Sequence, residues 1–195
     1  YDQKGVACAA RGWWLMGLFG HDRTQVLDGG LPAWQGAGLK LETGPSTAPM
    51  DTSPPFIARP RMRRLKGLGD MLDLTHAAGS CVILDARAHG RFTGELPEPR
   101  QGMPSGHMPG AASVPYTTLL ASDGHMLPPH ELRQIFAAAG MHPDKEAVCT
   151  CGSGMTACVL ALGLMASGLG QHAVYDGSWA EWASTPGTPI VTGDA

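Results

Sequence analysis

The chain has 195 residues, with 14 basic and 17 acidic side chains and a formal net charge of −3. This length suits one complete α/β domain plus a smaller part of another, since domains usually run to about 100–150 residues. Ordinary hydrophobic content and scattered charges exclude a disordered chain and disfavour nucleic acid as a partner.

Residues 1–42 are predicted to contain short elements. A helix is expected from Arg11 to Phe19, a short strand at Val26–Leu27 and a second helix beginning near Pro32, because proline is favoured in the first turn of a helix. Residues 43–60 are dense in Pro, Ser and Thr and show no apolar period. We interpret them as a linker between two domains.

Residues 61–195 alternate helical segments with short apolar runs, which is the pattern of a parallel sheet with helices on its faces. The predicted helices are Leu65–His76, Pro129–Ala139 and Thr156–Ser167, and the predicted strands are Cys81–Leu84, Ala147–Thr150 and Ala173–Tyr175. The predicted fold class is therefore α/β. The longest apolar stretch, Ala157–Ala166, is about half of a membrane span, so no membrane partner is expected.

The two parts of the chain repeat one pattern. Val-Leu-Asp-Gly-Gly at residues 26–30, followed by Trp34, matches Val-Tyr-Asp-Gly-Ser at residues 174–178, followed by Trp182, at a constant spacing of 148 residues. Such a repeat indicates two copies of one fold.

The repeat extends upstream when one residue is gapped. Lys4–Val6 then matches Ser153–Met155, and Asp2 falls opposite Cys151. We interpret residues 1–42 as the C-terminal part of an inactive copy and residues 61–195 as the complete, catalytic one. Because the chain opens on Tyr1, we expect it to be truncated at its N-terminus.

Five cysteines, an odd number without the paired spacing of a disulfide framework, favour free thiols in a reducing compartment, and the cytoplasm is the predicted location. Cys149, Cys151 and Cys158 follow the spacing C-x-C-x6-C with no fourth ligand nearby, so no metal is predicted. Cys149, inside a strand, and Cys158, on a helix, are interpreted as packing residues.

Cys151 lies where a predicted strand ends and a helix is about to begin. Such a corner gathers backbone N–H groups and the positive end of the helix dipole, so it stabilises an anion and favours a nucleophilic thiolate. Gly152 and Gly154 permit the required backbone angles. Taken alone, Cys151 has an alternative interpretation as a small buried hydrophobe. A phosphatase would need an arginine at the position of Ala157.

The loop from Cys151 to Ala157, CGSGMTA, resembles the active-site loop of the 3-mercaptopyruvate sulfurtransferases in the rhodanese family. Further segments are similar in order and spacing, so the resemblance covers nearly the whole chain: Asp85–Arg87, Gly90–Gly94, Pro97–Arg100, Gly106–Ala111 and Tyr175–Trp179. It implies a rhodanese-like domain with a central parallel sheet flanked by helices, preceded by the C-terminal remnant of a second copy. Met155 stands where the family usually has Val, a change that we expect the loop to tolerate.

The resemblance also implies a reaction without an external cofactor. The Cys151 thiolate would take sulfur from a small donor as a persulfide, and would pass it to cyanide, a thiol or a thioredoxin-like protein. Ser153 is the implied proton relay, and the relay's His and Asp partners are expected in a region outside this chain. The remaining loop positions implied to bind substrate are Gly152, Gly154, Met155 and Thr156.

Arg91 and Arg100 match the substrate-binding arginines of the family. A planar guanidinium grips a carboxylate through paired hydrogen bonds, so these two residues would hold the carboxylate and carbonyl end of mercaptopyruvate. Surface ion pairing with Glu95 or Glu98 is the alternative. His107 is interpreted as satisfying backbone groups in a turn and is left out of the catalytic set.

Members specific for thiosulfate carry basic residues directly after the cysteine, whereas Gly152 and Ser153 are neutral. This difference favours 3-mercaptopyruvate as the donor, with thiosulfate as the alternative. A second alternative, of a different class, is a non-catalytic sulfur carrier or binding module.

Overall fold

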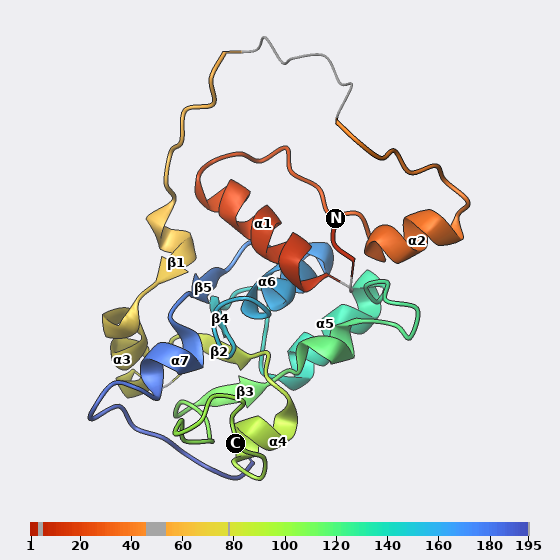
Figure 1. Cartoon of the computed structure of the whole chain (residues 1–195). Coiled ribbons are helices and arrows are strands. Elements are labelled where there is room, and N and C mark those ends of the chain that lie inside the picture. Colours follow the sequence, from red (N-terminus) through yellow and green to blue (C-terminus); the bar gives the residue numbers. More distant parts are fainter. Residues whose placement is uncertain (4–5, 46–53, 78, 195) are drawn as a thin grey trace.

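The structure is a computed structural model that describes residues 1–3, 6–45, 54–77 and 79–194 (Figure 1). In chain order its elements are α1 (Ala7–Leu18), α2 (Gly30–Gly36), the 3-10 turn η1 (Met62–Arg64), β1 (Leu65–Lys66), α3 (Leu68–His76), β2 (Val82–Asp85), α4 (His89–Thr93), β3 (Ala111–Ser113), the 3-10 turn η2 (Tyr116–Leu119), α5 (Pro129–Ala138), β4 (Ala147–Thr150), α6 (Ala157–Ala166), β5 (Ala173–Tyr175) and α7 (Ser178–Trp182).

A five-stranded sheet in the order β1-β5-β4-β2-β3 forms the centre of the molecule, and each pairing in it is parallel. Its middle strands are buried on both faces: Leu84 and Cys149 belong to one core cluster, and Ile83 and Val148 belong to the other. Covered parallel strands read as continuous apolar runs, which is why these segments were predictable. The predicted α/β fold with a parallel sheet is confirmed.

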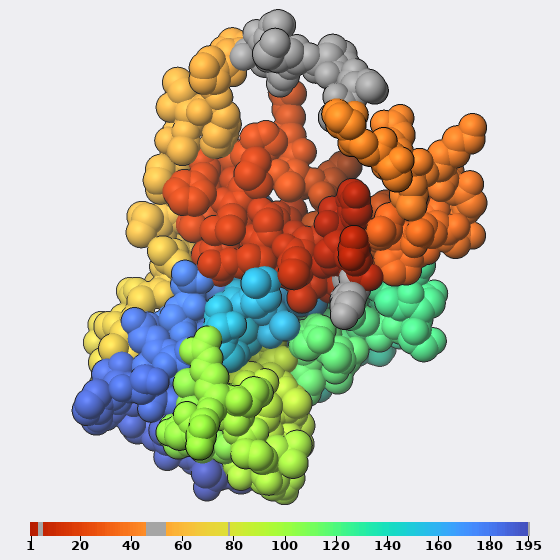
Figure 2. Space-filling view, viewed as in Figure 1, coloured from red at the N-terminus to blue at the C-terminus, as the bar shows by residue number. Residues whose placement is uncertain are grey.

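Helices cover both faces of the sheet, and α1 adds a further layer on one of them. Helices α5 and α6 pack together on one face, and α1 packs on the outer side of α6. The opposite face is covered by α3 and α7, which contribute Met71, Trp179 and Trp182 to the second cluster. Figure 2 shows the red surface of α1 lying directly against the blue surface of α6.

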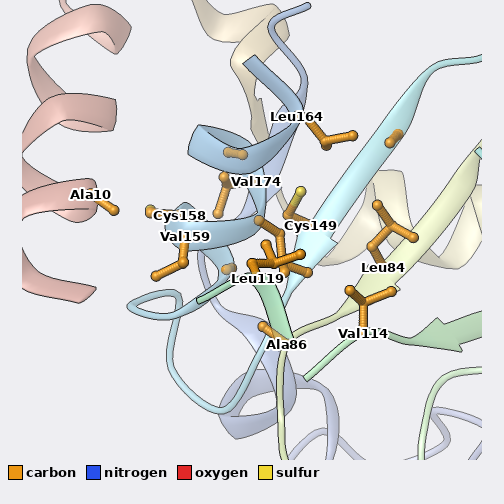
Figure 3. Packing of buried hydrophobic residues seen from close by; sticks show 14 of the residues in the cluster. Ala10, Leu84, Ala86, Val114, Leu119, Cys149, Cys158, Val159, Leu164 and Val174 are labelled. Carbon is orange, nitrogen blue, oxygen red and sulfur yellow. The ribbon is translucent and has the colours of Figure 1, made fainter. Parts of the chain in front are cut away.

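Helix α6 is apolar on every side because it lies between the sheet and α1. From α1, Ala10 and Trp14 are fully buried against this layer, and Ala10 faces Cys158 and Val159 of α6 (Figure 3). Within the described ranges, no helix has both the length and the apolar character needed to cross a membrane.

The segment before η1 is tied to the end of α1. The Arg61 guanidinium donates two hydrogen bonds of 2.6 Å to the Asp22 carboxylate, and the Arg59 N–H donates to the Phe19 carbonyl at 2.8 Å. Residues 43–45 and 54–60 contain no helix or strand. The rest of the predicted linker, 46–53, lies outside the described residues, as do Lys4 and Gly5 of the predicted repeat.

Two sequence predictions of secondary structure are wrong. Leu65–Lys66 form strand β1 and not the start of a helix, because they pair with Val174 and Tyr175 more than 100 residues away in sequence. Val26–Leu27 pair with no strand in the described part of the chain. Both are two-residue segments, whose state depends on whether a partner strand is present. The predicted helix at Arg11 begins earlier, at Ala7.

Candidate active site

Cys151 stands at the corner between β4 and α6. It directly follows Thr150, the last residue of β4, and α6 begins at Ala157. The side chain is only 1% exposed, and its Sγ accepts a hydrogen bond from the backbone N–H of Ser153 at 3.5 Å. The N-terminal end of α6 adds positive potential to the loop. The predicted strand-loop-helix corner is therefore present, and it places a backbone donor at the sulfur.

The back of the loop is fixed by the segment that follows β5. Gly154 has a φ of +77°, and a Cβ at this position would lie 2.6 Å from the carbonyl oxygen of Asp176. Only glycine fits this backbone and this close approach. The carbonyl of Cys151 accepts a hydrogen bond of 2.9 Å from the N–H of Trp179. The loop conformation thus depends on contacts with α7 as well as on its own glycines.

A pocket of about 270 Å³ opens in front of the thiol. Seven of the eight site residues predicted from the sequence line it, and they are Arg91, Arg100, Cys151, Gly152, Ser153, Met155 and Thr156. The remaining one, Gly154, lies behind the loop against Asp176. The predicted residues therefore come together around one cavity, with a single exception whose function is conformational.

Arg91 belongs to a chain of alternating charges beneath the pocket. Its Nε and Nη2 donate to the Glu98 carboxylate at 3.1 and 2.5 Å, and Arg87 donates to the same carboxylate at 2.8 Å. Arg87 also donates to Asp85 at 2.7 Å and lies 4.3 Å above the ring of Trp179. Two guanidinium groups and two carboxylates balance one another, which is what permits their burial.

Of the two ion-pair partners considered from the sequence, Glu98 pairs with Arg91, whereas Glu95 is exposed. The Glu98 side chain is 2% exposed and the Arg91 side chain 24%, so this is a partly buried pair and not a surface one. Arg91 nonetheless reaches the loop, because its Nη2 lies 3.2 Å from where a Cβ would stand at Gly152. Arg100 is exposed and lines the pocket from the solvent side.

Arg11 of α1 reaches the loop from the first part of the chain. Its Nη1 donates to Asp176 at 2.5 Å and to the Gly154 carbonyl at 3.3 Å, and the guanidinium lies over the ring of Trp14. Burial lowers the pKa of Arg11, but its hydrogen bond to Asp176 and the negative charge of that carboxylate raise the pKa above its ordinary value. Sequence reasoning missed Arg11, because no local pattern marks a contact that spans 143 residues.

The other two thiols of the cysteine cluster are core residues. Burial raises the pKa of Cys149 well above its ordinary value, and it raises the pKa of Cys158 to about 12. Both side chains have no exposed surface. They stay protonated near neutral pH and pack in the core, as their positions in a strand and a helix predicted.

His107 is buried behind Phe92 and does not line the pocket. Its Nδ1 lies 3.0 Å from the Phe92 carbonyl oxygen, and the two rings stack with centroids 3.8 Å apart. The sequence interpretation of His107 as a residue that satisfies the backbone is confirmed.

Comparisons with known proteins identify the family that the chain resembles. Residues 68–185 match the family described as Rhodanese-like domain. The chain is 38% identical over 208 residues to thiosulfate/3-mercaptopyruvate sulfurtransferase 2 of Arabidopsis thaliana, covering 98% of this chain and 61% of that relative. It is 41% identical over 197 residues to a probable 3-mercaptopyruvate sulfurtransferase of Pseudomonas aeruginosa, covering 100% of this chain and 67% of that relative.

Among solved structures, the sub-stoichiometric sulfur transferase subunit of yeast mitochondrial complex I superposes with a TM-score of 0.86 at 32% identity, covering 100% of this chain and 71% of that one. The chain spans 61% of the length of the Arabidopsis relative.

Proposed function

The chain belongs to the rhodanese family, and we propose that it is a sulfurtransferase that moves sulfur from 3-mercaptopyruvate to a thiophilic acceptor through a persulfide on Cys151. The observation that carries this proposal is the pocket of about 270 Å³ lined by Cys151, Arg91 and Arg100. A nucleophilic sulfur and two guanidinium groups around one small cavity suit a donor with sulfur at one end and a carboxylate at the other.

In the first half-reaction the Cys151 thiolate attacks the sulfur of 3-mercaptopyruvate. A sulfur–sulfur bond forms and the carbon–sulfur bond breaks. Its electron pair passes to the methylene carbon, and the resulting enolate takes up a proton to leave as pyruvate. The Ser153 N–H, 3.5 Å from Sγ, stabilises negative charge on the sulfur. We assign the delivery of the proton to the Ser153 hydroxyl.

In the second half-reaction a thiophilic acceptor attacks the outer sulfur of the persulfide. The sulfur–sulfur bond breaks, the acceptor keeps the outer sulfur, and Cys151 returns to the thiolate. Cyanide, a small thiol and a thioredoxin-like protein are all nucleophiles that suit this step. Because Cys151 cycles between thiolate and persulfide, the reaction consumes no external cofactor.

The charge around the pocket favours the monocarboxylate donor. Gly152 and Ser153 add no charge to the loop, and Glu98 already neutralises part of Arg91. A doubly charged donor such as thiosulfate binds most favourably where the basic side chains of the pocket have no carboxylate partners. Thiosulfate is therefore the second candidate donor. One similar protein carries both donors in its name.

We propose the same division of the chain as the repeat indicates, with residues 1–42 from an inactive copy, 43–60 as linker and 61–195 as the catalytic domain. The hydrogen bond from the Leu31 N–H to the Asp2 carbonyl, 2.9 Å long, repeats the one from Trp179 to Cys151 and supports this register. For the compartment we propose the cytoplasm, where thiols stay reduced; one similar protein is named as mitochondrial.

The test of the proposal compares Cys151→Ser with its matched control, Cys149→Ser. Persulfide formation and the release of pyruvate are measured for both variants. We expect Cys151→Ser to release no pyruvate from 3-mercaptopyruvate. We expect Cys149→Ser to retain most of the activity, because Cys149 lies inside β4 and does not line the pocket. Sulfur transfer by the Cys151 variant would refute the assignment. Persulfide formation without turnover in the presence of any acceptor would favour a non-catalytic sulfur carrier.

A further inference from the structure

Ser178, the first residue of α7, holds a backbone conformation that residues with a Cβ rarely adopt. Among the residues that the structure describes, it is the one non-glycine with a positive φ, of 52°. Its side chain has no exposed surface. A left-handed conformation costs free energy for an L-residue, and such strain persists where the surrounding structure demands it, often at functional sites.

The Ser178 hydroxyl joins the first residue of the active-site loop to its middle. Its Oγ accepts hydrogen bonds from the N–H of Cys151 at 3.2 Å and from the N–H of Gly154 at 3.0 Å. It donates its own proton to the carbonyl of Tyr175, the last residue of β5, at 2.8 Å. The same oxygen lies 4.0 Å from the Cys151 sulfur. One hydroxyl therefore fixes the loop to the carboxyl end of β5, close to the thiol.

The internal repeat supplies a comparison within the same molecule. Gly30 occupies the equivalent place in the first copy, with nearly the same φ of 59°. The backbone there is also matched, since Leu31 donates to the carbonyl of Asp2 as Trp179 donates to that of Cys151, both at 2.9 Å. The first copy, which has Asp2 at the position of Cys151, thus reaches this conformation with glycine, whereas the copy that carries Cys151 bears the strain of a serine.

We propose that Ser178 is a positioning residue that holds the backbone of the active-site loop so that the Ser153 N–H stays directed at the sulfur of Cys151. This inference rests on the proposed sulfur transfer through Cys151. Without the hydroxyl, the buried N–H groups of Cys151 and Gly154 lose their acceptor, and the loop must turn to find others. The Ser153 N–H then leaves its position 3.5 Å from Sγ, and the thiolate loses its donor.

The experiment compares Ser178→Ala and Ser178→Gly with the wild-type chain. Both variants remove the hydroxyl, but only glycine also relieves the strain, so the pair separates hydrogen bonding from backbone conformation. Ser167→Ala is the matched control, because Ser167 is also buried and its hydroxyl donates to the Leu164 carbonyl at the far end of α6. Far-UV circular dichroism establishes that each variant is folded, and glycine accommodates the φ of 52° at this position.

The first measurement is the rate at which iodoacetamide alkylates Cys151 at pH 7 without any donor, followed on the Cys151 peptide by mass spectrometry. We expect both Ser178 variants to react about tenfold more slowly, the factor that about 1.4 kcal/mol represents. The second measurement is steady-state sulfur transfer from 3-mercaptopyruvate. There we expect kcat to fall about tenfold while KM changes less than about twofold, because Arg91 and Arg100 are untouched.

The charged side chains around the loop, Arg11, Arg91, Glu98, Arg100 and Asp176, are the same in every variant, so the comparison isolates the hydroxyl. Wild-type alkylation and kcat in Ser178→Gly would overturn the inference, and so would a rise in KM with kcat unchanged. If instead Cys151→Ser still transferred sulfur, the proposed function would fail. The alkylation rates, measured without donor, would still decide whether the hydroxyl positions the thiol.

Discussion

The buried charge chain beneath the pocket makes Glu98→Gln an informative change. The variant keeps the size of the side chain but removes the negative charge that Arg87 and Arg91 share at 2.8 and 2.5 Å. Breaking a buried ion pair by neutralising one partner costs about 3–5 kcal/mol, and the amide oxygen can still accept a hydrogen bond, so we expect the lower value of about 3 kcal/mol. For a chain of 195 residues this corresponds to a fall in Tm of about 6–12 °C.

The same change alters the choice of donor. Removing one negative charge from the pocket wall favours a dianion over a monoanion, so the ratio of kcat/KM for thiosulfate to that for 3-mercaptopyruvate is expected to rise about fivefold, or ~1 kcal/mol. Both donors are assayed with cyanide as the acceptor. Glu95→Gln is the control, because Glu95 is exposed three residues earlier and its change is expected to cost less than about 0.5 kcal/mol. An unchanged Tm and an unchanged donor ratio in Glu98→Gln would contradict both expectations.

Two further predictions concern groups behind the loop. Arg11→Gln is expected to lower the free energy of unfolding in urea by about 1 kcal/mol and to slow persulfide formation. The loss of stability is modest because the Asp176 side chain is 46% exposed. Arg11→Lys is expected to retain most of the stability and most of the rate. Equal loss in the two variants would show that the charge is not what matters. Burial raises the pKa values of Cys149 and Cys158, so both remain neutral thiols at pH 8. Iodoacetamide is therefore expected to leave them unlabelled in the folded chain and to label the exposed Cys8. Labelling of Cys149 before unfolding would contradict this.

Much of the fold follows from local sequence. The runs at 147–150 and 173–175 are apolar because both faces of the sheet are covered, so their composition alone identified β4 and β5. The alternation of such runs with helical segments indicated a parallel sheet. Leu65–Lys66 was mistaken for helix, because a two-residue strand carries no period of its own and exists only through its pairing with β5. The short elements β3, α4 and α7 were missed for a related reason, since three to five residues show little periodicity.

The candidate site divides in the same way. The sequence by itself located the loop around Cys151, because a thiol, a strand end and two glycines stand next to one another in the chain, and the resemblance of that loop to the family made Cys151 the proposed nucleophile. Only the tertiary structure decided what surrounds that loop. It selects Glu98 over Glu95 as the partner of Arg91, and it brings Arg11 behind Gly154 and the strained Ser178 against the N–H groups of Cys151 and Gly154. Hydrogen bonds and ion pairs depend on positions in space. The contacts of Ser178 and Arg11 with Gly154 span 24 and 143 residues, so they leave no local pattern and appear only when the sheet brings its strand ends together.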